Sequence, residues 1–515
     1  MNGAESLLRS FVDGGVELCI TNPGTSEMHF VAALDRVPGM RAVLGLQENV
    51  VTGAADGYGR MLDKPAATLL HLGPGLANGL ANLHNARRAR TPIVNVIGDH
   101  ATTHRHLDAP LTSDVEAVAA PFSHWIRTST TCRSVGRDAA EAIAAARSQP
   151  GQIASLILPA DASWNEPGVP VKAIEPAGPP LPPEEAIAEI ATRLRASKSA
   201  VLMLSGMALR EGALEFAAAI AEATGAKLLS STFYGRLERG GDRADIGRLP
   251  YFPEQAADTI ADATDLVLVH TAAPVGFFAY PDKPSVLANP ETRIHTLAEP
   301  GEDAEGSLRM LAEALGVRPG KKGAYRSQAE RPDRPSGELN PLTLAAAIAA
   351  TLPSNTVVVD ESTTGGAFLL GMTASCPAHD WLSLTGGAIG MGMPAATGAA
   401  LACPDRRVLN VESDGSAMYT LQALWTQARE GLDITTVLLS NRSYAILNME
   451  LSRTGAAPSK EAERLFDLGN PDLDFVSLSR GMGVPAKRVE TAEDLTRALE
   501  SSFEESGPQL IEVAL

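Results

Sequence analysis

The sequence predicts an α/β protein made of three doubly wound parallel-sheet domains. Short apolar runs such as ATLLHL, PIVNVIG, SAVLMLSG and ITTVLLS alternate with Ala-rich helical segments along the chain. Apolar strands that alternate with helices are typical of parallel sheets covered on both faces. A chain of 515 residues is also too long for one hydrophobic core, and its length favours about three domains.

Two Pro-rich polar stretches mark where these domains meet. Residues 166–183 contain seven prolines, and residues 318–341 are rich in charge and proline. Because proline interrupts both helices and central strands, we interpret these stretches as linkers. The predicted domains are residues 1–165, 184–317 and 338–515.

Composition argues against several classes of protein. The net charge of −18 argues against a nucleic-acid partner. No apolar run reaches the roughly 18–20 residues that span a bilayer, and the N-terminal segment lacks the core of a signal peptide. The four cysteines are scattered without metal-ligand spacing. We therefore expect a cytoplasmic protein that does not contact membranes.

Residues 412–441 carry the most specific chemical pattern. Asp414 follows the apolar strand RRVLNV, and a helix and the strand ITTVLLS then lead to Asn441. In a right-handed crossover the carboxyl ends of the two strands share one edge, where ligands of open sheets bind. A carboxylate and an amide oxygen suit Mg²⁺. Gly415 and Ser416 form a turn in which Gly415 allows close backbone approach, and the helix expected from about Ala417 points free N–H groups at phosphate. The segment therefore predicts a diphosphate held by a metal ion.

This segment resembles the cofactor signature of thiamine diphosphate-dependent enzymes, in which Gly-Asp-Gly precedes a longer stretch that ends in Asn-Asn. The resemblance implies thiamine diphosphate and Mg²⁺ as cofactors. It implies that Asp414, Asn441 and the backbone carbonyl of Ser443 bind the metal ion. It also assigns Tyr444 to cofactor binding, together with Gly415 and the other residues of the segment.

Residues 44–60, LGLQENVVTGAADGYGR, place Glu48 where a strand gives way to a helix. A glutamate in the first turn of a helix is often a surface residue favoured by the helix dipole. In the resembling enzymes this motif supplies the glutamate that hydrogen-bonds the aminopyrimidine ring and activates the cofactor. A shielded carboxyl group of this kind can exchange a proton near neutral pH. The resemblance therefore implies that Glu48 is both catalytic and cofactor-binding.

The turns TNPGTSE and LHLGPG resemble loops that line the reacting centre of benzoylformate decarboxylases. The resemblance implies that Thr25 and His71 contact the substrate or transfer protons, with a purely structural histidine as the alternative for His71. Residues 98–114 hold three further histidines, and the same resemblance brings His104 toward the substrate pocket. Their spacing lacks the acidic partner of a zinc-binding helix.

Residues 385–398 and 360–366 complete the predicted cofactor site. The first segment, TGGAIGMGMPAATG, has small residues that permit close approach of a backbone to a ligand. The resemblance implies that Ile389 wedges between the two cofactor rings and holds them bent. It also implies that Thr363 and Thr364 contact the aminopyrimidine.

The resemblance also implies an assembly. It names the three domains pyrimidine-binding, central and diphosphate-binding. In the resembling enzymes each site combines the pyrimidine-binding domain of one subunit with the diphosphate-binding domain of another, so we expect a homodimer or a dimer of dimers. The acetolactate synthase branch often carries FAD in its central domain. The central segment here has no GxGxxG turn, and FAD is the lesser alternative.

We expect a thiamine diphosphate- and Mg²⁺-dependent enzyme that decarboxylates or ligates a small 2-oxo acid, as acetolactate synthases do. The alternatives are a benzoylformate decarboxylase-like enzyme and a non-catalytic cofactor-binding homologue. Ser383 and Glu450 stand where benzoylformate decarboxylases have aromatic rings, which argues against a phenyl substrate. Ser413 and Ser440 replace the first glycine and first asparagine of the metal signature, which supports the non-catalytic alternative.

Overall fold

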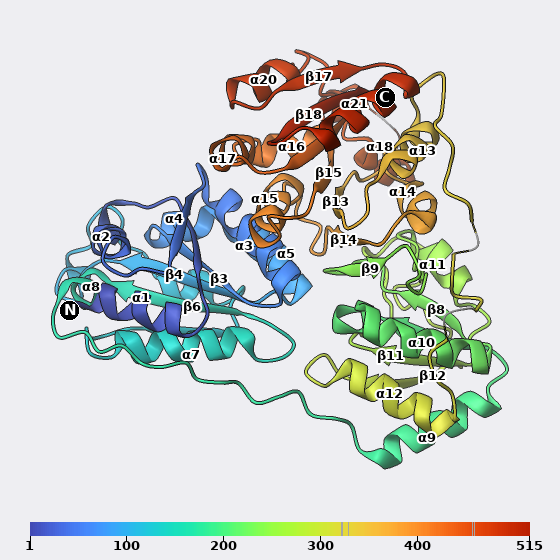
Figure 1. Ribbon diagram of the computed structural model, residues 1–515, viewed down its shortest axis with the longest axis horizontal. Coiled ribbons are helices and arrows are strands. Elements are labelled where there is room, and N and C mark those ends of the chain that lie inside the picture. Colours follow the sequence, from blue (N-terminus) through green and yellow to red (C-terminus); the bar gives the residue numbers. More distant parts are fainter. Residues whose placement is uncertain (321–322, 328, 456, 458) are drawn as a thin grey trace.

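Three sheets with helices on their faces form the structure, and the chain runs through them in order (Figure 1). The computed structural model describes residues 1–320, 323–327, 329–455, 457 and 459–515. The expected α/β fold class is confirmed, because parallel strand pairs dominate all three sheets of the described chain.

The N-terminal sheet has the strand order β2-β1-β3-β4-β6-β5, and all its described pairs are parallel. Its central strands are buried along their whole length, which explains their unbroken apolar sequences. The strands are β1 (Leu18–Thr21), β2 (Arg41–Leu44), β3 (Ala66–Leu70), β4 (Ile93–Asp99), β5 (Trp125–Thr128) and β6 (Ile153–Pro159). The helices are α1 (Gly3–Asp13), η1 (Thr25–Glu27), α2 (Met28–Leu34), α3 (Glu48–Leu62), α4 (Leu72–Asn78), α5 (Leu80–Ala89), η2 (Arg105–Leu107), α6 (Val115–Ala119), α7 (Val135–Arg147) and α8 (Ala160–Trp164).

The central sheet has the order β10-β8-β7-β11-β12. Residues 166–183 lead into it without forming helix or strand, and they cross below the N-terminal sheet in Figure 1. The strands are β7 (Ala200–Leu204), β8 (Lys227–Ser230), β10 (Gly247–Arg248), β11 (Asp265–Val269) and β12 (Arg293–Ala298). The helices are α9 (Glu184–Ala196), η3 (Gly206–Leu209), α10 (Glu211–Thr224), α11 (Pro253–Thr259) and α12 (Ala304–Leu315). The three domain ranges stay predictions.

The C-terminal sheet has the order β17-β18-β16-β15-β13-β14-β9, and only its edge pair β14–β9 is antiparallel among the described strands. The strands are β9 (Leu237–Arg239), β13 (Val357–Glu361), β14 (His379–Ser383), β15 (Val408–Ser413), β16 (Ile434–Ser440), β17 (Ala486–Val489) and β18 (Gln509–Ala514). The helices are α13 (Pro341–Thr351), α14 (Leu369–Met372), η4 (Thr373–Ser375), α15 (Gly392–Ala402), α16 (Asp414–Thr420), α17 (Ala423–Glu430), α18 (Ala445–Arg453), α19 (Lys460–Phe466), α20 (Phe475–Gly481) and α21 (Ala492–Glu504).

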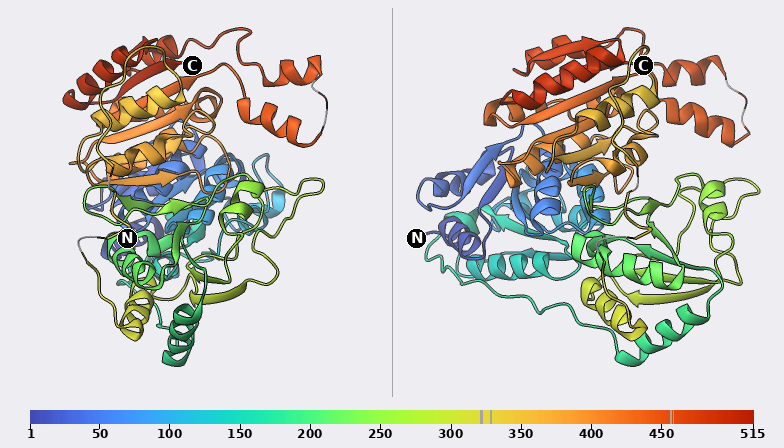
Figure 2. Two further views of the ribbon diagram at one scale, coloured as in Figure 1. Left: turned by 90° about the vertical axis from the view of Figure 1, so that its right-hand side faces the viewer. Right: turned by 45° about the vertical axis from the view of Figure 1, so that its right-hand side comes forward.

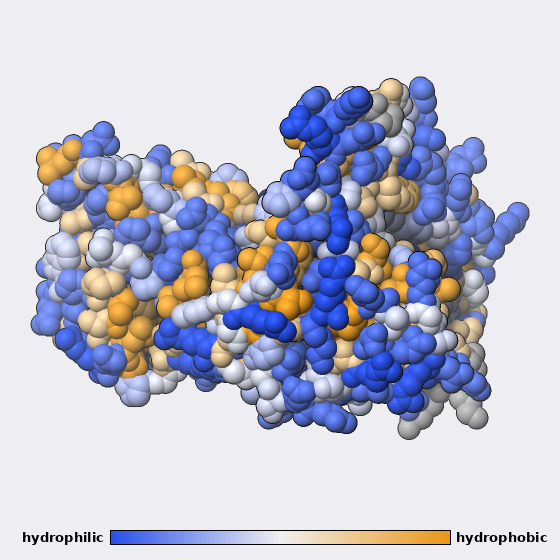
Figure 3. All heavy atoms as spheres, turned by 90° about the horizontal axis from the view of Figure 1, so that it is seen from above, coloured by the Kyte–Doolittle hydropathy of each residue, from blue (hydrophilic) through white to orange (hydrophobic). Residues whose placement is uncertain are grey.

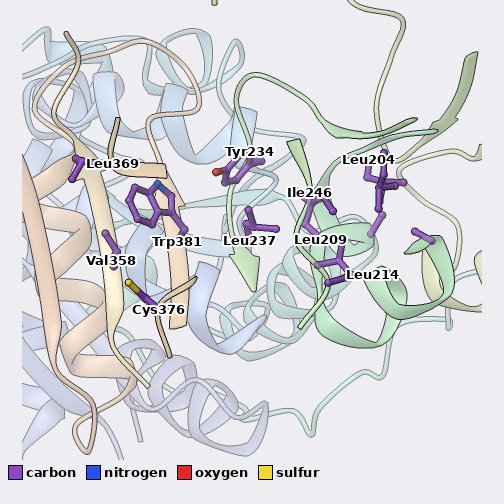
Figure 4. Packing of buried hydrophobic residues seen from close by; sticks show 14 of the residues in the cluster. Leu204, Leu209, Leu214, Tyr234, Leu237, Ile246, Val358, Leu369, Cys376 and Trp381 are labelled. Atoms are coloured by element: carbon purple, nitrogen blue, oxygen red, sulfur yellow. The ribbon is translucent and has the colours of Figure 1, made fainter. Parts of the chain in front are cut away.

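Strand β9 joins the central and C-terminal parts, because it comes from the central part of the sequence and pairs with β14. The hydrophobic core continues across this junction. Tyr234 and Leu237 lie between Trp381 of the C-terminal sheet and Ile246, and all four side chains are buried (Figure 4). The two parts therefore share one core.

Close packing of α3 against α15 fixes the N-terminal part on the C-terminal part. A Cβ at Gly57 would overlap the backbone of α15, and a Cβ at Gly398 would overlap the backbone of α3. Helix α3 begins at Glu48, and α15 follows the loop that contains Ile389. This contact therefore fixes how the start of α3 and the Ile389 loop of one chain lie relative to each other.

Helices α18 and α19 project from the body of the C-terminal part (Figure 2). Seen from above, hydrophilic side chains cover most of the molecule, with apolar groups between them near the middle of the view (Figure 3). Over the part of the chain that the structure describes, no helix has the length and apolar character needed to cross a membrane.

Candidate active site

The edge where β15 and β16 end brings Asp414 and Asn441 together. The two strands pair in parallel, and one predicted ligand follows each of them. Asp414 is buried, and its carboxylate accepts hydrogen bonds from the backbone N–H groups of Gly415 (2.8 Å) and Arg442 (2.7 Å). The second bond ties the loop after β16 directly to Asp414.

The loop after β16 continues this cluster. The Oδ1 atom of Asn441 accepts a hydrogen bond from the backbone N–H of Ser443 (3.0 Å). The ring of Tyr444 packs against Gly415, where a Cβ would overlap the ring. Ser416 is also buried at this edge. The predicted metal ligands and diphosphate contacts thus come from two adjacent strand ends.

The donors at this edge are oxygen atoms. Burial raises the pKa of Asp414, because a charged carboxylate is less stable away from water, and a bound cation would oppose that shift. No group of three His, Cys, Asp or Glu side chains in the described chain could hold a metal ion. A cation here would therefore be bound by one carboxylate, amide and carbonyl oxygens, and the oxygens of its ligand, as Mg²⁺ is with phosphates.

Glu48 is the first residue of α3 and is only 7% exposed. Gln47 caps the helix, with its side-chain oxygen accepting from the backbone N–H of Val50 (3.2 Å). The Oε2 atom of Glu48 accepts from Asn78 Nδ2 (3.0 Å), and Oε1 lies 3.5 Å from Asn22 Nδ2. Glu48 is thus not the exposed first-turn glutamate that was the structural alternative.

His71 follows β3 and lies beside a glutamate that the sequence analysis missed. Its Nδ1 atom is 2.9 Å from Oε2 of Glu27, which is 3% exposed. Ser26 also donates a hydrogen bond to Glu27. Thr25 is exposed at the start of η1, so these loops bring Thr25 and His71 into one region. The motif TNPGTSE contains Glu27, but its burial depends on packing that the sequence does not show.

The loops from the C-terminal sheet surround Ile389 and Thr363. Ile389 is half-buried, and the flanking Gly390 carbonyl accepts from Asn82 Nδ2 (3.1 Å), a residue of α5. Thr363 Oγ1 hydrogen-bonds Ser413 Oγ (2.8 Å), and Thr364 beside it is partly buried. These loops therefore contact both the sheet edge where β15 ends beside Asp414 and the N-terminal part.

The sequence also showed no sign of a pair of buried carboxyl groups, Glu361 and Glu412. Glu361 and Glu412 are each 1% exposed and lie together beneath the Ile389 loop. Glu361 accepts from the backbone N–H groups of Gly390 (2.8 Å) and Gly392. Burial raises the pKa of Glu361 to about 7, and burial together with the neighbouring Glu361 raises the pKa of Glu412.

Three non-glycine residues with positive φ lie in the loops of this site: Leu72 (48°), Thr363 (47°) and Arg442 (57°). Such conformations are costly for side chains with a Cβ and concentrate at functional sites. The left-handed turn at Leu72 follows His71 directly, and the one at Arg442 follows Asn441. The sequence alone does not reveal them.

Ser383 and Glu450, the two polar residues that argue against a phenyl substrate, lie in different surroundings. Ser383 is buried, and its hydroxyl donates to the backbone carbonyl of Tyr234 (2.6 Å), so it braces the sheet rather than offering a free group to a ligand. Glu450 is partly exposed on α18, where it accepts from the hydroxyl of Tyr280 (2.6 Å) and lies 3.8 Å from Arg453.

Histidines 100 and 104 lie close to each other in the loop after β4, with ring centroids 5.4 Å apart. His104 itself is exposed. Its predicted approach to the substrate pocket stays a prediction.

Family models and relatives agree on one family. The family model described as "Thiamine pyrophosphate enzyme, N-terminal TPP binding domain" matches residues 1–119. The family model described as "Thiamine pyrophosphate enzyme, C-terminal TPP binding domain" matches residues 366–513. A Mycobacterium tuberculosis protein, provisionally named acetolactate synthase large subunit IlvX, is 52% identical over 100% of this chain and 99% of its own.

The chain belongs to the thiamine pyrophosphate enzymes. Thiamine diphosphate, the same compound, is therefore its cofactor. The Pseudomonas aeruginosa benzoylformate decarboxylase is 29% identical over 97% of this chain and 96% of its own. A solved 4-hydroxybenzoylformate decarboxylase from Rhodococcus jostii RHA1 is similar in fold, with a TM-score of 0.86, 24% identity, and coverage of 100% of this chain and 99% of that one.

The residues present fit this cofactor. Buried Asp414 accepts hydrogen bonds from the backbone N–H groups of Gly415 and Arg442, and these leave its carboxylate charge for a metal ion. The absent Cβ at Gly415 lets the ring of Tyr444 pack directly against this backbone beside Asp414. A Cβ at Gly75 would lie 3.5 Å from Oε1 of Glu48, so small residues also line the carboxyl group expected to meet the aminopyrimidine.

A cavity at the carboxyl edge of the central sheet bears on the flavin alternative. It has a volume of about 50 Å³, and Gly206, Arg210 and His270 are among its lining residues. Cofactor pockets usually measure about 300–1,000 Å³. FAD stays the lesser alternative of the sequence analysis.

Proposed function

We propose that this enzyme uses thiamine diphosphate and Mg²⁺ to decarboxylate a small 2-oxo acid, with ligation to a second carbonyl compound as the acetolactate synthase-like outcome. Asp414, Asn441 and the carbonyl of Ser443 would hold the metal ion. Gly415 and Ser416 would approach the diphosphate, and Tyr444 would cover it. The position of these groups at adjacent strand ends supports this assignment.

The observation that carries the proposal is the buried carboxyl group of Glu48 at the start of α3. When bound, thiamine diphosphate supplies a carbon nucleophile and an electron sink for loss of CO₂. Glu48 would exchange a proton with the aminopyrimidine ring, and Asn78 would hold its carboxyl group in place. Ile389 would keep the two rings bent, with Thr363 and Thr364 against the aminopyrimidine.

His71 and Thr25 would act on the substrate side. The exposed hydroxyl of Thr25 would bind the substrate, and the partly exposed ring of His71 would transfer protons. Glu450, which accepts a hydrogen bond from Tyr280, stands where benzoylformate decarboxylases have an aromatic ring, and this difference favours a polar 2-oxo acid over a phenyl one.

We further propose a homodimer, or a dimer of dimers, with each site completed by a second subunit. Large apolar side chains are exposed beside the site, with Phe368 49%, Met418 41% and Tyr419 52% exposed. Met418 and Tyr419 lie on the helix that Asp414 begins, so a second copy of the chain covering them would also cover the site. Four free cysteines agree with a cytoplasmic location.

The test measures CO₂ release from a panel of 2-oxo acids with thiamine diphosphate and Mg²⁺, in wild type and Glu48→Gln. We expect release by wild type, reduced by about 10²–10⁴-fold in the variant. Pyruvate as the best donor with acetolactate as product would identify a synthase, and aldehyde as the main product would identify a decarboxylase.

Absence of release from every acid would contradict the proposal, provided that the cofactor raises the melting temperature of the same sample. That outcome would favour the non-catalytic homologue that the two serines of the metal signature support. A yellow protein as purified would favour the flavin alternative.

A further inference from the structure

Glu27 forms a small network with His71 that the proposed function does not use. Its Oε2 atom is 2.9 Å from His71 Nδ1 and accepts the backbone N–H of Gly24 (2.9 Å). Its Oε1 atom accepts the hydroxyl of Ser26. Ser26 Oγ is also 3.3 Å from His71 Nδ1. The carboxylate is therefore surrounded by donors on both oxygens.

Two glycines leave the space that this network fills. A Cβ at Gly24 would overlap the ring of His71, and a Cβ at Gly98 at the end of β4 would overlap Oε1 of Glu27. Because protein interiors are packed without spare volume, these contacts fix the orientation of both the ring and the carboxylate.

The donor pattern determines which ring nitrogen carries the hydrogen. An ionised carboxylate only accepts hydrogen bonds, so the Nδ1 atom of His71 must donate to Glu27. In the described chain no group hydrogen-bonds Nε2, and the His71 side chain is 20% exposed. Nε2 is therefore the nitrogen left to meet a ligand.

We infer that Glu27 is a positioning residue that holds His71 with its hydrogen on Nδ1 and directs Nε2 toward the reacting carbon. The inference rests on the proposed role of His71 in proton transfer. In the imidazolium form His71 gives its Nε2 proton to a substrate-derived carbon and becomes the neutral Nδ1–H form, still bonded to Glu27. It recovers the proton from water.

The first test replaces Glu27 by Gln, which keeps size but puts an N–H₂ group in the network. If the N–H₂ group takes the place of Oε2, it points a donor at Nδ1 and also faces the N–H of Gly24, so the ring hydrogen moves to Nε2. If the carbonyl oxygen stays there, the ring keeps its hydrogen bond but loses the negative charge that favours the imidazolium form. We expect kcat to fall about 10²-fold, with KM and cofactor affinity nearly unchanged. In a His71→Gln background, Glu27→Gln should cause no further loss.

Ser26→Ala is the matched control, because it removes a neighbouring hydrogen bond and leaves the Glu27–His71 contact. We expect a much smaller loss of kcat from it. Equal losses in Glu27→Gln and Ser26→Ala, or losses by Glu27→Gln and His71→Gln that simply multiply, would mean that Glu27 only supports the loop and would overturn the inference.

A second measurement needs no substrate and keeps the two proposals distinguishable. Acylation of the holoenzyme with diethyl pyrocarbonate, followed by peptide mass spectrometry, measures how fast His71 reacts. A bare Nε2 should react several-fold faster in wild type than in Glu27→Gln, while thermal unfolding checks that the variant is folded. Equal rates would contradict the inference even if wild type releases CO₂, and a faster wild type would support it even if no 2-oxo acid is decarboxylated.

Discussion

The two halves of the site treat buried carboxyl groups differently. In the N-terminal half, Glu27 and Glu48 accept hydrogen bonds from nitrogen and hydroxyl donors. In the C-terminal half, Glu361 and Glu412 lie against each other, and burial raises the pKa of both. Asp414, which lies two residues after Glu412 in the chain, accepts hydrogen bonds from the backbone N–H groups of Gly415 and Arg442.

This difference suggests a division of work. The carboxylates of the N-terminal half support side chains that face a ligand, such as the ring of His71. In the C-terminal half, Glu361 of the carboxyl pair holds the backbone of the Ile389 loop through the N–H groups of Gly390 and Gly392. We therefore expect the N-terminal half to govern chemistry and the C-terminal half to govern cofactor binding and stability.

Asp414→Ala gives the largest expected effect and tests that division directly. Removing the carboxylate proposed to hold the metal ion should weaken Mg²⁺-dependent cofactor binding by at least about 100-fold, because even residues that only support metal ligands contribute 10–100-fold. Isothermal calorimetry with thiamine diphosphate and Mg²⁺ measures this change.

Glu48→Gln is the matched variant from the other half. It should bind the cofactor within a few-fold of wild type but lose exchange of the cofactor C2 proton, read by NMR after acid quench. Exchange that survives in Glu48→Gln, or cofactor affinity that survives in Asp414→Ala, would remove the proposed division.

Gly415→Ala should have a smaller effect on the same half. Its Cβ would overlap the ring of Tyr444, and forced repacking of this kind costs about 1–3 kcal/mol. We expect roughly tenfold weaker cofactor affinity, measured by calorimetry. Gly371→Ala is the control, because a Cβ there has open space; equal affinities for the two variants would mean that the cofactor does not approach this backbone.

Some of this site follows from sequence, and some does not. Asp414 and Asn441 were predictable because each directly follows an apolar strand, and parallel strands end at one edge. The Glu27–His71 contact was not, since it joins residues 44 positions apart through space that only glycines leave open. The Glu361–Glu412 pair also escaped prediction, because a carboxyl group on a strand gives no sign of which neighbour it will face.

The carboxyl pair should make stability depend on pH. The folded-state pKa of Glu361, about 7, lies above its ordinary value of 4.5, so the folded protein holds a proton that the unfolded chain releases. This contribution is fully present below pH 4.5 and is lost as the pH rises through about 7. We expect the melting temperature of the cofactor-free protein to fall between pH 5 and pH 7, by roughly 1 °C for each kcal/mol lost in a chain of this length.

Glu412→Gln should flatten that fall, because Glu361 would then ionise beside a neutral amide that can donate to it. Exposed Glu504→Gln is the control and should follow wild type. A wild-type curve that is already flat from pH 5 to pH 7 would argue that the pair is not protonated in the folded protein.

Ser413→Gly gives the smallest expected effect and tests whether the departure from the family signature matters. The Ser413 hydroxyl donates to the carbonyl of Glu361 (3.0 Å) and hydrogen-bonds Thr363 (2.8 Å), so it braces the strained Thr363 loop against β13. Losing these bonds should lower the free energy of unfolding by about 1 kcal/mol, measured by urea titration, and leave cofactor affinity unchanged. Ser413→Ala is the control, because it removes the hydrogen bonds without adding the backbone freedom of glycine.

Tighter cofactor binding by Ser413→Gly would mean that the serine weakens cofactor binding in wild type, and it would favour the non-catalytic alternative. An unchanged affinity would mean that the C-terminal half binds its cofactor with the serine present and that the serine only stabilises the loop.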